Sequence, residues 1–137
     1  MNFQVIGSTY KIKKSELEKV AKAAFSYFPT RAGEIELKFV SEKEMTRLNH
    51  IYREINKVTD VLSFNISQSP LVGQVFICYN YARRQSVDLK KEFIDEVCLL
   101  LTHGNLNIYG YDHASEVETQ MMQKIEKEIL NQEGYTR

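Results

Sequence analysis

The residues best suited to chemistry lie close together in the stretch HGNLNIYGYDH, residues 103–113. His103 and Asn107 are four residues apart, so they project from the same face of a helix. Gly110 predicts a left-handed helix end, which can return His113 toward that face as in zinc proteases with the pattern HExxHxxGxxH. This spacing is typical of a metal site with three ligands.

Two positions depart from the zinc-protease pattern. Gly104 stands where such a protease has its general-base Glu, which argues against peptide hydrolysis by that route. Asn107 stands at the middle ligand position, and an amide oxygen is a poorer zinc ligand than an imidazole nitrogen. Either two His and an Asn hold a metal weakly, or Asp112 or Cys78 replaces the missing ligand. Because Asp112 adjoins His113, we interpret it as a cap or as a partner that orients an imidazole, and Cys78 as a core thiol.

Helices must position these residues, and three capping boxes predict where helices begin. In each box a Ser is followed three residues later by a Glu, at Ser15, Ser41 and Ser115. Together with apolar residues at helical spacing, they predict helices over about 15–28, 41–55 and from 115 onward. A central helix, with Asp88 as its expected N-cap, carries the histidine stretch. The last helix is expected to bury Val117, Met121, Ile125 and Ile129.

Strands are predicted by alternation of apolar and polar residues. Ile35, Leu37 and Phe39 alternate with charged residues, as in a strand with one wet face. Other strands are expected at about 3–6, 60–66 and 74–79. The order β-α-β-α-β-β-α-α predicts an α+β fold, in which helices cover one face of a small mixed sheet of about four strands.

Composition limits the class of protein. The 137 residues predict a single domain, residues 1–137, and 43% apolar with 26% charged residues is typical of a soluble globular chain. The longest apolar run, 97–101, is too short to span a membrane, and we expect a cytoplasmic location. With 18 basic and 18 acidic residues, a polyanion would be held by a local patch. Cys78 and Cys98, without a CxxC spacing, are expected to be reduced.

A second motif lies upstream, where Arg53 is followed by TDVLSF at residues 59–64. With the stretch at 103–113, this order of motifs resembles the YbeY family, bacterial endoribonucleases of ribosomal RNA maturation whose signature reads HGxLHLxGYDH. The resemblance covers about residues 41–130 and implies the family's α+β fold. Three positions depart from the family, where Asn107, Gln74 and Asn65 replace a His, an Asp and a Pro.

The resemblance implies a zinc site and a catalytic arginine in one cleft. One zinc ion would be bound by His103 and His113, with Asn107 at a weak or vacant ligand position, and His103 would also be catalytic. Arg53, implied to be catalytic, would be an anion clamp whose planar fork of donors stabilises charge on a phosphate. The competing interpretation of Arg53 is a solvated cation at a helix end.

Arg83 and Arg84 are the candidates for contacting the RNA outside that cleft. They are interleaved with Tyr79 and Tyr81 beside a predicted strand end, a composition suited to base stacking and phosphate contact. The competing interpretation of this segment is a solvated turn.

Three functions remain open at this stage. The leading hypothesis is a metal-dependent, single-strand-specific endoribonuclease in ribosomal RNA maturation and ribosome quality control. Its partners would be single-stranded or ribosomal RNA and the small ribosomal subunit with its assembly factors, with neither a membrane nor DNA expected. Asn107, Gln74 and Asn65 motivate the alternative, a catalytically impaired RNA- or ribosome-binding module. Hydrolysis of some other phosphate ester is the third.

Overall fold

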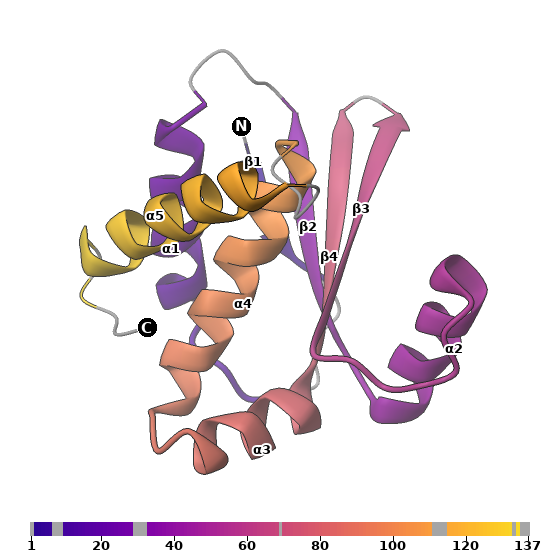
Figure 1. Ribbon diagram of the computed structural model, residues 1–137. Helices are drawn as coiled ribbons and strands as arrows, with labels where there is room; N and C mark the ends of the chain where they lie inside the picture. The colour runs from indigo at the N-terminus through magenta and orange to yellow at the C-terminus, as the bar shows by residue number, and fades with distance from the viewer. Residues whose placement is uncertain are drawn as a thin grey trace.

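The computed structural model describes residues 2–6, 10–28, 33–68, 70–110, 115–132 and 134 (Figure 1). In chain order, the elements within these ranges are β1 (Asn2–Val5), α1 (Lys14–Ser26), β2 (Glu34–Val40), α2 (Glu42–Arg53), β3 (Val61–Gln68), β4 (Leu71–Cys78), α3 (Tyr79–Asp88), α4 (Phe93–Ile108) and α5 (Glu116–Gln132).

The strands form one mixed sheet in the order β1-β2-β4-β3. β1, β2 and β4 run parallel, and β3 pairs with β4 in the antiparallel direction, so β3 lies at an edge of the sheet. Ile35, Leu37 and Phe39 of β2 are buried, as their alternation predicted. The predicted α+β fold, with a mixed sheet of four strands in the described part of the chain and helices packed on it, is confirmed.

Helices pack on both faces of this sheet, whereas we expected them on one. α1, α4 and α5 gather on one side and share the larger buried cluster with β2 and β4, while α2 lies on the other side (Figure 1). There, Met45 and Leu48 of α2 meet Val40, Leu62 and Cys78 from the strands. The expectation was wrong because these strand residues make part of the second face apolar, and that area needs a cover of its own.

Two of the three predicted capping boxes form at helix starts. The hydroxyl oxygens of Ser41 and Ser115 each accept a hydrogen bond, 3.1 Å long, from the backbone N–H three residues later. The box at Ser15 does not form, because α1 already begins at Lys14 and Lys13 provides no side-chain cap. Serine boxes therefore fixed the starts of α2 and α5 but not that of α1.

The segment interpreted as a solvated turn is a helix. α3 occupies it, with Tyr79, Ala82 and Ser86 buried. Asp88 is the last residue of this helix and not the cap of the next one, since α4 begins at Phe93 after Glu92. Two of the three buried residues of α3, Ala82 and Ser86, are small and leave only a weak apolar pattern. For this reason the sequence did not indicate a helix there.

α5 buries a stripe that matches the predicted one at Ile129 and, partly buried against the core, at Ile125, but not at its first turns. Val117 is 65% exposed and Met121 48% exposed. The buried residues of this helix are Met122, Glu126, Ile129 and Leu130. The buried face of α5 is thus rotated from the predicted one, and as a result the side chain of Glu126 lies in the interior of the protein. None of the described helices is long and apolar enough to cross a membrane.

α4 approaches β4 closely at two glycines, one on each element. A Cβ atom on Gly104 would lie 2.8 Å from Cγ1 of Val75, and one on Gly73 would lie 2.6 Å from Cδ1 of Ile108. Real Cβ atoms do not come so close, so both positions require glycine for this packing. The glycines fix how near α4 lies to the sheet, and with it the position of the side chains that α4 presents beside β3.

Replacing Gly104 with Ala is expected to lower the free energy of unfolding by about 1 to 3 kcal/mol, because the added methyl group overlaps the buried Val75 side chain. The sign of this change in the free energy of unfolding tests the packing, because Gly to Ala in an uncrowded helix raises it by about 0.5 to 1 kcal/mol. Urea unfolding followed by circular dichroism measures it. Gln123→Ala, at an exposed position of α5, is the control. A Gly104→Ala protein as stable as the natural chain would contradict the close approach.

Candidate active site

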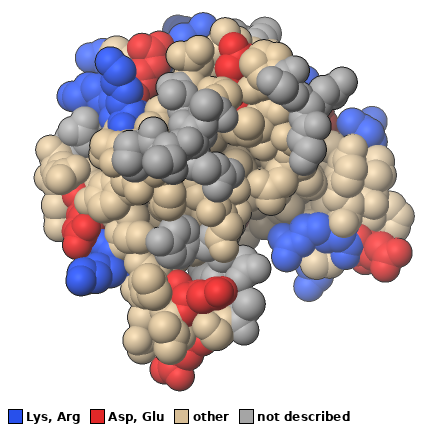
Figure 2. Space-filling view, turned by 90° about the horizontal axis from the view of Figure 1, so that it is seen from above, with Lys and Arg blue, Asp and Glu red and all other residues tan. Residues whose placement is uncertain are grey.

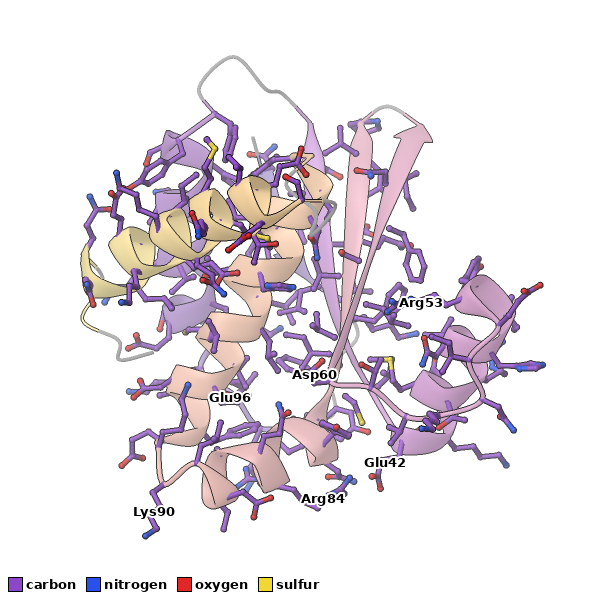
Figure 3. All side chains as sticks on the ribbon, viewed as in Figure 1. Glu42, Arg53, Asp60, Arg84, Lys90 and Glu96 are labelled. Atoms are coloured by element: carbon purple, nitrogen blue, oxygen red, sulfur yellow. The ribbon has the colours of Figure 1, made fainter. Side chains whose placement is uncertain are left out.

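A cleft with a volume of about 690 Å³ lies along β3, between residues at the ends of α2 and α4. Its lining consists of Arg53, residues 59–65, His103, Asn107, Ile108 and Gly110. In Figure 3, the Arg53 side chain extends from the end of α2 toward β3, and Asp60 lies at the start of β3. The cleft therefore brings together the two motifs that the sequence analysis singled out.

His103 is held by a buried carboxylate. Its Nδ1 atom lies 2.7 Å from Oε1 of Glu126, whose side chain is only 3% exposed, while His103 is 28% exposed. With Glu126 ionised, Nδ1–H donates to the carboxylate, and Nε2 is then the ring nitrogen that carries a lone pair. Carboxylates orient metal-binding or proton-accepting imidazoles in this way. The contact thus gives His103 a defined tautomer.

Glu126 was missed by the sequence analysis, which expected Ile125 to face the core. A signal for it exists: Glu126 lies four residues after Met122 and four before Leu130, so it interrupts a buried apolar stripe. A glutamate is seldom fully buried unless it has a partner. A charged residue in such a stripe therefore indicates a buried partner, which here is His103.

Asn107 lies one turn after His103, and both line the cleft, so their predicted common face is confirmed. Gly110 has a φ of 104°, which confirms the predicted left-handed backbone at the end of α4. His113 and Asp112 lie outside the described residues. In the ranges that the structure covers, no group of three His, Cys, Asp or Glu side chains is arranged to hold a metal.

The alternative ligand Cys78 is buried and does not line the cleft. Burial raises the pKa of the Cys78 thiol and raises that of Cys98 to about 12. Metals bind the thiolate, so a raised pKa disfavours coordination. Both cysteines are free thiols, as expected, and Cys78 belongs to the smaller buried cluster beneath α2.

Arg53 is the last residue of α2, which ends there because Glu54 adopts a left-handed conformation with a φ of 57°. The Glu54 N–H donates to the carbonyl oxygen of His50, a bond of 3.0 Å that closes the helix end. Among the described residues, Arg53 forms no ion pair. Its guanidinium therefore brings a positive charge to the cleft that no ion pair with a described carboxylate neutralises.

Arg83 and Arg84 make contacts within the protein, and neither lines the cleft. Arg84 forms an ion pair with Glu42, which ties α3 to α2. Arg83 donates a hydrogen bond of 2.8 Å to the Tyr79 hydroxyl and lies over the ring of Phe93, 4.4 Å from its centroid. Both side chains hold α3 in place, and their predicted contact with RNA would lie outside this cleft.

Asp60 anchors the strand that forms the cleft wall, a role that the sequence did not reveal. Its Oδ1 accepts a hydrogen bond from the Val61 N–H at 2.7 Å, and its Oδ2 accepts one from Gln85 at 3.3 Å. Gln85 also donates to buried Glu96 at 2.7 Å, and Lys91 lies 3.0 Å from the same carboxylate. This chain of polar contacts connects the cleft to α3 and α4.

The other two departures from the family pattern lie in different places. Asn65 lines the cleft. Gln74 instead donates a hydrogen bond of 3.0 Å to Glu36 on the neighbouring strand, and it is not among the cleft residues. Only Asn107 and Asn65 therefore change the surface that a substrate in this cleft would meet.

Replacing Glu126 with Leu is expected to abolish the preference of His103 for the Nδ1–H tautomer, because the accepting carboxylate is lost. The measurement is the ¹⁵N chemical shift of both ring nitrogens at about pH 8.5, where an ordinary imidazole is neutral. Exposed His50 serves as an internal reference in the same spectrum. Unchanged His103 shifts in the Glu126→Leu protein would mean that Glu126 does not set the tautomer.

Comparisons with known proteins show the family of this chain. The family model described as Endoribonuclease YbeY matches residues 3–134. Proteins named Endoribonuclease YbeY include one from Ureaplasma urealyticum, 38% identical over 74% of this chain and 68% of its own length. Another, from Legionella pneumophila, is 35% identical over 94% of this chain and 85% of its own length. A solution structure of a Thermotoga maritima protein, 22% identical, shares the fold over 96% of this chain and 91% of that one, with a TM-score of 0.63. The chain belongs to the YbeY family.

Proposed function

We propose that this protein is a metal-dependent endoribonuclease that cuts single-stranded RNA during ribosomal RNA maturation and ribosome quality control. The observation that carries the proposal is that Arg53 and His103 line one cleft. Membership of a family whose relatives are named endoribonucleases supports RNA as the substrate. The proposed partners are ribosomal RNA and the small ribosomal subunit with its assembly factors.

Arg53 supplies the main charge stabilisation in the proposed mechanism. Its guanidinium is always protonated and presents two parallel N–H donors, a geometry that matches two oxygens of a phosphate. Negative charge grows on these oxygens when a nucleophile attacks phosphorus, so hydrogen bonds from Arg53 strengthen in the transition state. Because no described carboxylate pairs with Arg53, the substrate phosphate does not have to displace one.

His103 and Glu126 form the second part of the mechanism. Glu126 keeps Nε2 of His103 as the nitrogen with a lone pair, the form needed to bind a metal ion or to accept a proton. We propose that His103 and His113 hold one zinc ion, with Asn107 at a weak or vacant ligand position. The oriented imidazole fits a metal, and the Asn107 amide is a weak donor for zinc. The ion, when bound, supplies Lewis-acid stabilisation of negative charge on the phosphate.

The charge distribution fits recognition of RNA at one place. Figure 2 shows Lys and Arg residues in separate groups on the visible face, most of them beside Asp or Glu residues. The chain as a whole has no net charge. Affinity for a polyanion therefore has to come from local cations such as Arg53, and we expect binding to weaken moderately with salt.

Substituting Arg53 with Ala is expected to lower kcat for cleavage of single-stranded RNA by about a hundred- to a thousandfold, because a donor to the transition-state charge is lost. Cleavage is followed with a labelled oligonucleotide in the presence of zinc, manganese or magnesium. Arg47→Ala removes an exposed arginine from the same helix, outside the cleft, and should leave kcat unchanged. Equal activity of the Arg53→Ala and natural proteins would refute the clamp.

Metal binding is tested by elemental analysis and calorimetry on the purified protein. We expect one zinc ion per chain, its loss in His103→Ala, and tighter binding in Asn107→His, because imidazole is the better zinc ligand. Glu126→Leu should weaken binding by about ten- to a hundredfold. If the natural protein binds no metal and cuts no RNA while Asn107→His does both, the alternative of a binding module with a decayed site would replace our proposal.

A further inference from the structure

Exposed apolar side chains concentrate at the end of α2, next to the cleft. Ile51, Tyr52 and Ile55 are three of the large apolar residues that the structure leaves in solvent, and they flank Arg53 in the sequence. Tyr52 is 62% exposed, so most of its ring surface is not used for packing. A large exposed ring next in sequence to an arginine of the cleft indicates a binding site for a ligand with an apolar face.

Tyr52 is nevertheless held in a defined place by a series of aromatic rings. Its ring centroid lies 4.7 Å from that of Phe64, with the ring planes at 52°. Phe64 in turn meets Phe76 edge to face, with centroids 5.7 Å apart. Phe76 comes from β4, Phe64 from β3 and Tyr52 from α2, so the series leads from the sheet to the surface. Phe64 also lines the cleft, which makes the series continuous with the proposed active site.

The residue that follows Tyr52 in the sequence is the arginine of the cleft. The last turn of α2 carries His50 and Arg53, and Arg53 follows Tyr52 directly. An aromatic ring and a guanidinium on consecutive residues match the two parts of one nucleotide, a flat base and a charged phosphate. Base stacking on aromatic side chains combined with backbone contacts to cations is the general mode of single-strand binding.

We propose that Tyr52, supported by Phe64, is a nucleobase subsite that stacks the base next to the phosphate held by Arg53. The inference rests on the proposed function, because it takes RNA as the ligand. A base can reach Tyr52 only when it is not paired inside a duplex, so the subsite accounts for a preference for single strands. Stacking uses the face that all bases share, and the subsite is therefore tolerant of sequence.

A protein partner is the competing occupant, and the two differ in the residues that they need. An apolar protein surface would cover Ile51 and Ile55 together with Tyr52. A base needs the ring of Tyr52 and the nearby cation, but neither isoleucine. Because Tyr52 packs on Phe64, and both Phe64 and the next residue, Arg53, line the cleft, the observations favour the base.

The test is the affinity for a single-stranded oligonucleotide, measured by fluorescence anisotropy without relying on cleavage. Tyr52→Ala is expected to weaken binding by about five- to a hundredfold, the loss of one stacked base, whereas Tyr52→Phe should bind as the natural protein does. Ile51→Ser with Ile55→Ser is the matched control and should not change the affinity. Loss of affinity in this control with full affinity in Tyr52→Ala would overturn the subsite in favour of an apolar docking surface.

A second readout places the base on the ring itself. The chain contains no Trp, so Tyr52→Trp introduces a single reporter. Its fluorescence is expected to be quenched by a normal oligonucleotide and much less by one that is abasic throughout, while Ile51→Trp should respond weakly to both. Equal quenching by the normal and abasic strands would overturn the inference.

If the natural protein binds no RNA, the proposed function and the subsite both fail. If it binds equally well with Tyr52→Ala, only the subsite fails.

Discussion

The contact on which the site depends is the close packing of α4 against β4 at Gly104 and Val75. A helix that carries any side chain at position 104 would have to stand farther from the sheet. His103 and Asn107 would then move relative to β3, whose residues form the wall of the same cleft. The glycine that seemed to be a lost catalytic position is thus a packing requirement. Position 104 faces β4, so a general base could not act from there.

The second constraint is the placement of charge on either side of the cleft. Glu126 places a buried carboxyl group next to His103, whereas Arg53 brings a positive charge that forms no ion pair with a described carboxylate. Burying a carboxylate is costly unless a donor compensates it, and the imidazole of His103, 2.7 Å away, is that partner for Glu126. Since the chain has no net charge, attraction of an anion to this cleft depends on the local charge of Arg53.

Sequence reasoning succeeded where a pattern has one structural solution. Alternation along β2 and the left-handed Gly110 follow from backbone geometry, and both were predicted correctly. It failed where the outcome depends on a neighbour that periodicity does not reveal. α3 buries mainly small residues, so its pattern was too weak to detect, and the face of α5 was predicted only in part because the apolar stripe does not include the buried Glu126. The charged residue is inside because His103 meets it there, a contact between positions 23 residues apart.

Asn107 is best understood together with these surroundings. It lies in the cleft one turn from an imidazole that a buried carboxylate already orients, so the loss of one imidazole leaves the rest of the geometry in place. Burying a carboxylate against an imidazole adds little net stability, so the contact between Glu126 and His103 is better explained by orientation of the imidazole than by stability of the fold. Arg53 is held at a helix end by a residue with a left-handed backbone. Orientation of His103 and placement of Arg53 thus both act on the one cleft that these side chains line, and neither depends on an imidazole at position 107.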